Sequence, residues 1–133
     1  MKRFLILLIL STLLLCGCKY NRGIILFNKE PITKENVLNN SKVFAVGCPV
    51  YYLFIAPKKM DNYYIRVQIF KMTDKAPWGG YEVRRTKDFR LMKDERYYHS
   101  DYFVLHEKGR YVMQVFSIED LQNPLSIGDF YVK

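Results

Sequence analysis

The sequence predicts an all-β protein built as a single sandwich of antiparallel sheets. From Val43 onward, aromatic and β-branched residues recur at period two, as they do in half-buried strands. Gly, Pro, Asn and Asp separate these runs at intervals of roughly 10–15 residues, the spacing of strands and turns in sandwiches. No long segment shows the 3.6-residue period of a helix. We therefore expect the sandwich to occupy residues 42–133.

The segment before the sandwich, residues 18–41, is expected to act as a tether that includes a candidate first strand. Ile24–Phe27 is a short apolar run, and the polar residues before it suit a spacer. Pro31 ends the strand pattern because it lacks a backbone N–H. Residues 33–40 suit either one short helical turn or a loop.

The strands expected after residue 42 share an alternating or fully apolar pattern between turn residues. They are residues 50–55, 63–71, 81–84, 89–92, 101–106, 110–116 and 126–132. Side chains alternate across a strand, so each run divides into two faces. The predicted core-facing set is Tyr63, Ile65, Val67, Ile69, Phe103, Leu105, Tyr111, Met113, Val115, Phe130 and Val132.

One local pattern refines the predicted fold. Leu105 is followed by Gly109 and, after one further residue, by Tyr111 at the start of an alternating strand. This spacing resembles the tyrosine corner of immunoglobulin-like sandwiches, which implies that the Tyr111 hydroxyl returns to upstream backbone. The chain departs from antibody-type domains because it lacks their cysteine pair, and because Trp78 lies in a Gly-rich loop. The resemblance covers residues 43–133 and implies a scaffold without any particular chemistry.

The N-terminus has the outline of a secretory signal peptide. Lys2 and Arg3 precede a mostly apolar stretch, residues 4–15, which is shorter than the roughly 20 residues that span a bilayer. The sequence Leu15-Cys16-Gly17-Cys18 then resembles the lipobox of bacterial lipoproteins.

That resemblance implies a signal peptide over residues 1–17 and a diacylglyceryl group on Cys18, with Leu15 and Gly17 as its recognition context. It also implies attachment to the membrane of the cell envelope. Lys19 follows in place of the Asp found in lipoproteins kept at the inner membrane, which favours the outer membrane if the cell has one. The alternative is an ordinary signal peptide cut after Gly17.

Charge gives little support for nucleic-acid binding. Loss of Lys2 and Arg3 with the signal lowers the formal charge from +8 to +6. The remaining basic residues are scattered, without the dense clusters typical of nucleic-acid patches. We expect no nucleic-acid partner.

The sequence predicts no catalytic, metal or cofactor site. The chain lacks a phosphate-binding glycine loop and the common hydrolase and zinc motifs. Its two histidines, His99 and His106, are expected to be solvated and turn-side respectively. Cys48 has no partner for a disulfide and is expected to be a small buried residue. We interpret the chain as non-enzymatic.

Aromatic residues outnumber the positions on the predicted core faces. The sequence has 11 Tyr and nine Phe, and several fall on the faces opposite the core: Tyr64, Phe70, Tyr102, Phe116 and Tyr131. Outward aromatics suggest a contact surface, because monomers rarely expose large apolar patches. The alternative is that the N-terminal segment or long loops cover them.

Two functions remain open at this point. The first is an envelope-tethered module that binds another envelope protein through an aromatic face. The second is a small-ligand or glycan-binding lipoprotein, with Trp78 and nearby tyrosines as a stacking platform and Arg84 or Arg85 as donors. The candidate binding residues are Tyr64, Phe70, Trp78, Phe116 and Tyr131. A protein partner predicts a broad aromatic patch, whereas a glycan predicts a cleft that holds Trp78.

Overall fold

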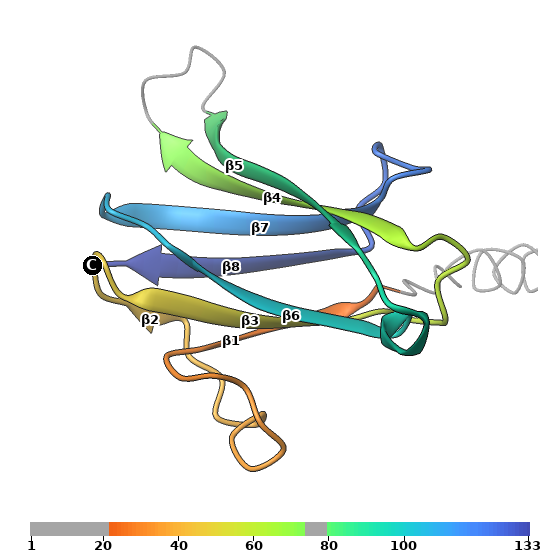
Figure 1. Cartoon of the computed structure of the whole chain (residues 1–133). Helices are drawn as coiled ribbons and strands as arrows, with labels where there is room; N and C mark the ends of the chain where they lie inside the picture. Colours follow the sequence, from red (N-terminus) through yellow and green to blue (C-terminus); the bar gives the residue numbers. More distant parts are fainter. Residues whose placement is uncertain (1–21, 74–79) are drawn as a thin grey trace, which may run out of the picture.

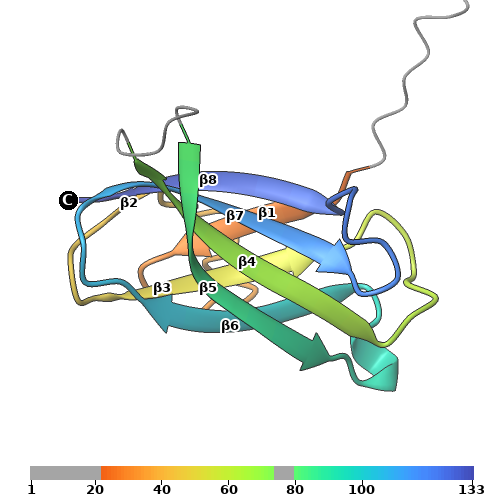
Figure 2. The same cartoon turned by 90° about the horizontal axis from the view of Figure 1, so that it is seen from above.

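Two β-sheets pack face to face in the computed structural model, which describes residues 22–73 and 80–133 (Figures 1 and 2). The three-stranded sheet has the order β1 (Ile24–Asn28), β3 (Pro49–Ile55), β6 (Tyr98–Val104). The five-stranded sheet has the order β2 (Val43–Phe44), β8 (Ser126–Val132), β7 (Gly109–Ser117), β4 (Tyr64–Thr73), β5 (Gly80–Arg90). A 3₁₀ turn, η1 (Lys93–Glu95), leads from β5 into β6.

Neighbouring strands are antiparallel except β2 and β8, which run parallel. The predicted class, an all-β sandwich, is confirmed. Residues 33–40 form turns and loop between β1 and β2. Among the described residues, no helix is long and apolar enough to cross a membrane.

The core lies between the sheets and is formed by alternate residues of each strand. Phe130 of β8 lies at its centre, with ring contacts to Phe27, Phe44, Phe103 and Tyr111 at centroid distances of 4.9–6.0 Å. All the predicted core-facing residues are buried except Tyr63, which is partly exposed. The alternation that predicted these faces is therefore correct in β4, β6, β7 and β8.

The tyrosine corner is present. The Tyr111 hydroxyl donates to the Glu107 backbone oxygen at 2.7 Å, four residues upstream. Only 1% of Tyr111 is exposed, and its ring stacks on Phe130 at 5.5 Å and 8°. This contact fixes the β6–β7 connection, where the chain passes from one sheet to the other.

β5 differs from the prediction. Residues 81–84 and 89–92 were expected to form two short strands, but β5 is continuous and pairs with β4 along its whole length. A bulge between Ile69 and Phe70 of β4 leaves Arg84 as the extra residue of β5. β5 is an edge strand, and edge strands commonly carry solvated charges. The charged residues in its middle interrupt the apolar alternation that would otherwise predict one strand.

The chain enters the fold at one edge of the sandwich, where β1 meets β8. The Gly23 N–H donates to the Leu125 oxygen, and the Ser126 hydroxyl donates to the Gly23 oxygen, both at 2.7 Å. Gly128 lies so close to Phe27 that an added Cβ would be 2.9 Å from the ring. Figures 1 and 2 show β1 starting at the end of the sandwich opposite the C-terminus.

Two predicted environments are wrong. Cys48 is exposed rather than buried, because the turn over residues 45–48, with Gly47 at φ +76°, projects it outside β3. His99 is partly buried rather than fully solvated. It faces inward on β6, with its ring 4.2 Å from that of Phe89, and its buried Nε2 has no hydrogen-bond partner. His106 is exposed after β6, as expected for a turn-side residue.

Candidate functional site

The outer surface of the five-stranded sheet, here called the broad face, carries an apolar row across neighbouring strands. Cα partners in an antiparallel sheet lie side by side and point to the same face. The pairing places Val83 of β5 beside Phe70 of β4, Phe70 beside Val112 of β7, and Val112 beside Asp129 of β8. Three of these four side chains are apolar, although the row lies outside the core.

A second row lies beside the first and is also largely apolar. Tyr81 pairs with Met72, and Arg110 pairs with Tyr131, which in turn pairs with Val43 of β2. The exposed apolar residues of the two rows and of neighbouring β8 are Tyr81, Val83, Met72, Ile127, Tyr131 and Val43. About half of Tyr81 and Val83 is accessible, at 48% and 54%. Arg110 and Asp129 interrupt the rows between β7 and β8, but the apolar residues still cluster on this face instead of being scattered singly.

A groove of about 450 Å³ crosses the broad face. Its walls come from four strands: Tyr81 of β5, Phe70 of β4, Arg110, Val112 and Gln114 of β7, and Ile127, Gly128 and Asp129 of β8. The volume falls within the roughly 300–1,000 Å³ of small-molecule sites. Aromatic rings therefore stand beside polar side chains that can orient a ligand.

Charged side chains at one side of the groove are paired. Arg110 Nη2 donates to Asp129 Oδ2 at 3.4 Å, and Lys42 Nζ donates to Asp129 Oδ1 at 3.3 Å. Burial alone would raise the pKa of Asp129, but Lys42 and Arg110 outweigh it and hold that pKa below its usual value. The Arg110 guanidinium also lies 5.9 Å from the Tyr131 ring. Asp129 thus stays ionised, and Arg110 keeps donors free for a partner.

The structure separates the residues that the sequence predicted as a binding set. Phe70 lines the groove, and Tyr131 lies beside Arg110. Tyr64 is exposed on the same face but pairs with Arg90 at the far end of β4. Phe116, expected to be exposed, is 5% exposed and is therefore no part of a surface patch. Trp78 lies outside the described residues.

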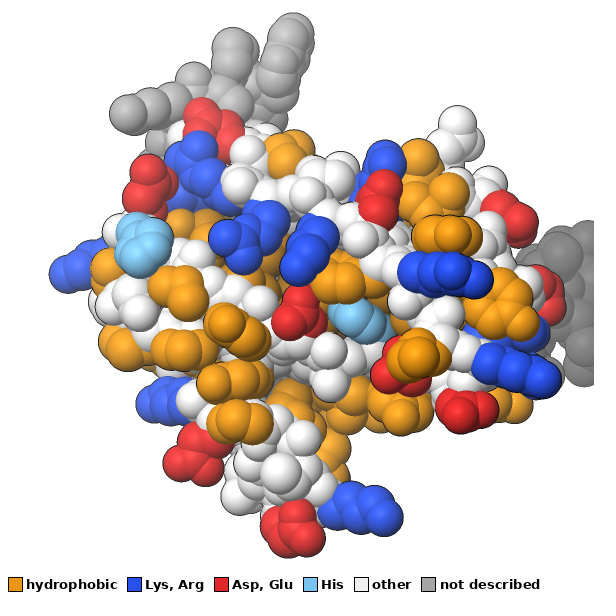
Figure 3. Space-filling view, in the orientation of Figure 1, with side chains coloured by type: hydrophobic (Ala, Val, Ile, Leu, Met, Phe, Trp, Pro, Cys, Tyr) orange, Lys and Arg blue, Asp and Glu red, His pale blue; other side chains and the backbone are white. Residues whose placement is uncertain are grey.

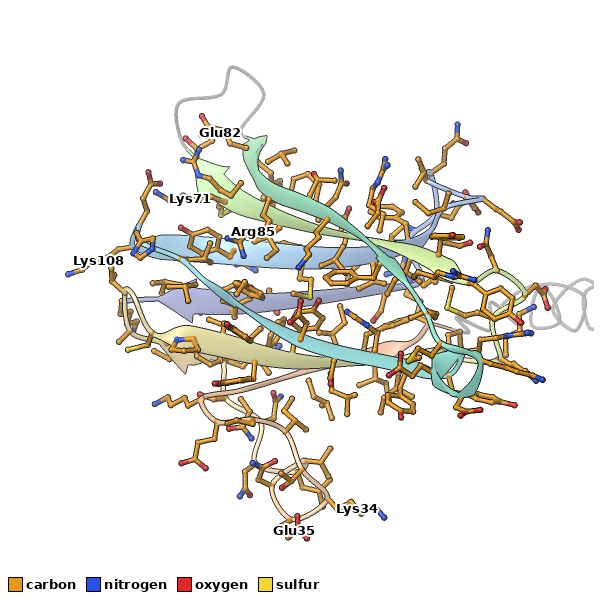
Figure 4. All side chains as sticks on the ribbon, in the orientation of Figure 1. Lys34, Glu35, Lys71, Glu82, Arg85 and Lys108 are labelled. Atoms are coloured by element: carbon orange, nitrogen blue, oxygen red, sulfur yellow. The ribbon has the colours of Figure 1, made fainter. Side chains whose placement is uncertain are left out.

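Two further predicted contributors lie away from the groove. Arg84 is bound to Glu82 at 2.9 Å and to Glu107 at 3.1 Å. Arg85 lines a small cavity between β5 and β6, and Figure 4 shows its side chain reaching from β5 over the space between the sheets. Tyr102, the other outward aromatic predicted, lies on the three-stranded sheet.

Sequence reasoning missed most of the groove. Tyr81, Arg110, Val112, Ile127 and Asp129 were not singled out, because they meet only through the strand order. One signal was available: Val112 and Ile127 are apolar at positions that the alternation assigns to the outer face.

The space between β5 and β6 contains a polar cluster. Lys87 Nζ lies 3.7 Å from Asp101 Oδ2, and the cavity there measures about 20 Å³, room for little more than one water molecule. Burial lowers the pKa of His99, and burial also raises the pKa of Tyr52, which the charge of Asp101 raises further and that of Arg85 lowers. Among the described residues, no group of three His, Cys, Asp or Glu side chains could hold a metal ion. The cluster fits a structural role.

Comparison with known proteins gives a fold. No protein-family model and no curated protein matches the chain. Among solved structures, the chain is similar to an immunoglobulin-like protein from Pseudomonas aeruginosa, with 13% identity and a TM-score of 0.51, covering 83% of this chain and 92% of that one. It is also similar to the soluble domain of PmoD from a Methylocystis species, with 11% identity and a TM-score of 0.51, covering 86% and 93%. With the tyrosine corner and the two sheets, these likenesses show that the chain has an immunoglobulin-like fold.

Proposed function

We propose that this chain is a lipid-anchored, non-catalytic protein of the bacterial cell envelope that binds a protein partner through its broad face. The observation that carries the proposal is the pair of apolar rows that crosses the five-stranded sheet. They extend from Tyr81 and Val83 on β5 to Tyr131 on β8, beyond the limits of the groove. An extended surface of this kind suits a protein better than a small ligand.

The composition of the broad face supports a protein partner. Interface energy concentrates in a few aromatic and Arg anchors surrounded by contacts that exclude water. Tyr81, Phe70 and Tyr131 are candidate anchors, and the Arg110–Asp129 pair that lies between them adds hydrogen-bonding capacity. Partner binding would remove the exposed apolar area from water, at roughly 25 cal/mol per Å² before the costs of association.

The N-terminal sequence supports the anchor. Leu15-Cys16-Gly17-Cys18 resembles a lipobox, and the fold begins five residues after Cys18, where Gly23 is bonded to β8 and the loop before it. A lipid on Cys18 would hold the sandwich close to the membrane. Two or three acyl chains are needed for stable attachment.

Mass spectrometry of the mature N-terminus tests the anchor. We expect processing before Cys18 and a mass that includes acyl chains, and we expect Cys18→Ser to leave an uncleaved precursor. A mature protein that begins with unmodified Cys18 would refute the lipid anchor.

Affinity capture with surface variants tests the broad face. We expect Tyr81→Ser and Ile127→Ser to weaken capture of the partner by roughly tenfold or more, the scale of hot-spot losses. Tyr64→Ser is the matched control, since Tyr64 is an exposed aromatic on the same face about 20 Å along β4 from Phe70. If Tyr81→Ser and Ile127→Ser captured the partner as well as Tyr64→Ser and the unaltered protein do, the groove region would be excluded as the binding site.

A polysaccharide or small ligand is the second candidate. The groove favours it because Phe70 and Tyr81 offer ring surfaces beside Arg110, Gln114 and Asp129. In that case, substitutions inside the groove would abolish binding, whereas Val43→Ser, outside it, would have no effect. A protein partner that covers both rows predicts a loss from Val43→Ser as well.

A further inference from the structure

On the outer surface of the three-stranded sheet, here called the narrow face, the outward residues of the strands carry no charged side chain, whereas the bordering loop after β1 carries Lys34 and Glu35. Alternate residues of β1, β3 and β6 point outward, since the intervening ones are buried or face the core. The outward residues are Ile24, Leu26, Asn28, Pro49, Tyr51, Leu53, Ile55, Tyr98, Ser100, Tyr102 and Val104. The broad face, by contrast, carries Arg66, Asp88, Arg110 and Asp129.

The exposed part of the narrow face begins where the chain enters the fold. Ile24 pairs with Ile55, which pairs with Tyr98, so these three side chains form one row across the sheet. All three are exposed, Ile24 at 55% and Tyr98 at 45%. These exposed side chains lie beside Gly23, where the chain enters the fold, and they add little to the buried core.

An apolar cleft of about 510 Å³ continues from this row. Leu53, Ile55 and Tyr98 line one side, and Ile32, Lys34 and Val37 of the loop after β1 line the other, so the lining is largely apolar with one charged side chain. Leu38 on that loop is 91% exposed. In Figure 3 hydrophobic side chains gather over the region of β3 and β6, with charged side chains on the loop below it, and Figure 4 shows Lys34 and Glu35 at the loop tip.

The length of the tether limits where this surface can lie. Five residue steps separate Cys18 from Gly23, and an extended chain spans at most about 3.6 Å per residue, so the reach is about 18 Å. The hydrogen bonds of Gly23 fix the end of that span to the sandwich. If Cys18 carries lipid, Gly23 lies no more than about 18 Å from the lipid-modified residue, so the row that starts at the next residue, Ile24, is held near the bilayer surface.

We propose that the narrow face docks on the surface of the bilayer that holds the lipid anchor, an inference that rests on the proposed anchoring at Cys18. Tyrosines suit this environment because their rings sit at the headgroup level, and uncharged apolar side chains enter the acyl boundary without desolvating an ion. The broad face, on the opposite side of the sandwich, then points away from the membrane and stays open to a partner.

Quenching by brominated lipids tests the docking. The full-length lipidated protein, with Cys48→Ser to remove the exposed thiol, is reconstituted into vesicles of phosphatidylethanolamine and phosphatidylglycerol. A fluorophore is attached in turn to Leu38→Cys, Tyr98→Cys and, as the control on the broad face, Thr86→Cys. We expect several-fold stronger quenching at positions 38 and 98 than at 86. Equal quenching at the three positions would overturn the proposal.

A charge variant and a flotation assay separate the possible failures. Ile55→Glu should reduce quenching at position 98, because a carboxylate resists the apolar boundary, whereas Val83→Glu on the broad face should leave it unchanged. Flotation of the unlabelled protein with the vesicles measures membrane attachment through the lipid anchor, whichever face of the sandwich lies against the bilayer. Flotation without selective quenching refutes only the docking, and absence of flotation refutes the anchor and the docking together.

Discussion

Tyr111 contributes to stability through the hydrogen bond from its hydroxyl to the Glu107 backbone oxygen. Because Tyr111 is buried, water cannot easily take over this bond. Tyr111→Phe keeps the ring on Phe130 but leaves the Glu107 oxygen without its partner at 2.7 Å. The expected loss is about 1–3 kcal/mol of unfolding free energy, measured from the denaturant midpoint. Tyr131→Phe is the control, since Tyr131 is exposed and its loss should stay within about 0.5 kcal/mol. Equal midpoints for both variants would argue against the corner.

His99 should make stability depend on pH. Burial lowers its pKa from the usual value of 6.5, assisted by Lys87 and opposed by Asp101 and Glu95. Just below pH 6.5, His99 binds a proton in the unfolded chain but not in the folded one. The free energy of unfolding is therefore unaffected by His99 above pH 6.5, and it declines as pH falls from 6.5 to the lowered pKa of the folded state.

The measurement is unfolding free energy between about pH 7 and pH 5, where an ordinary His titrates. His99→Phe should flatten the decline, and His106→Phe, at an exposed position, should retain it. A decline of equal slope in both variants would mean that His99 is not its source.

Phe116 and Tyr131 show what residue-level patterns predict and what they do not. Alternation placed both on the outer surface, but it does not report which outer positions are covered, and Phe116 is buried near the end of β7. Phe116→Ser should therefore cost about 3–5 kcal/mol in thermal or denaturant unfolding. Tyr131→Ser should cost about 0.5 kcal/mol or less. Similar losses in the two variants would contradict this assignment.

At the scale of elements, β1 and β8 close one edge of the sandwich through a close approach that depends on glycine. Gly128→Ala would place a methyl group 2.9 Å from the Phe27 ring and 3.3 Å from Ile25 Cβ. Overpacking of this kind costs about 1–3 kcal/mol. Ile127→Ala, one residue earlier and exposed on the broad face, is the control and should cost less. If Gly128→Ala left the free energy of unfolding unchanged, β1 and β8 would be able to separate slightly without loss of stability.

The strands that the sequence predicted well have a buried face with strict alternation, as β4 and β7 do. β5 was divided in two because the Arg84–Asp88 segment is polar on both faces, and only pairing with β4 makes it a strand. Cys48 was misplaced for a related reason: the turn that projects it depends on backbone conformation at Gly47, which hydrophobicity does not report.

At the scale of the whole molecule, strand order creates surfaces that no local pattern contains. The groove joins residues of β4, β5, β7 and β8, and the narrow face joins β1, β3 and β6. The sequence predicted Phe70 and Tyr131 on an outer face, but it could not predict which distant residues lie beside them, because that depends on register between strands. The sandwich thus has a mixed, grooved face on one side, and on the other a face whose strands present no charged side chain.

The most direct test of this account is site-specific photo-crosslinking in intact cells. A photoreactive residue is placed at Tyr81 on the broad face, at Tyr98 on the narrow face, and at exposed Lys108 in the β6–β7 turn as the control. We predict one discrete protein adduct at position 81, lipid adducts at position 98, and neither at position 108. A protein adduct at position 98 with none at position 81 would contradict the assignment of the two faces.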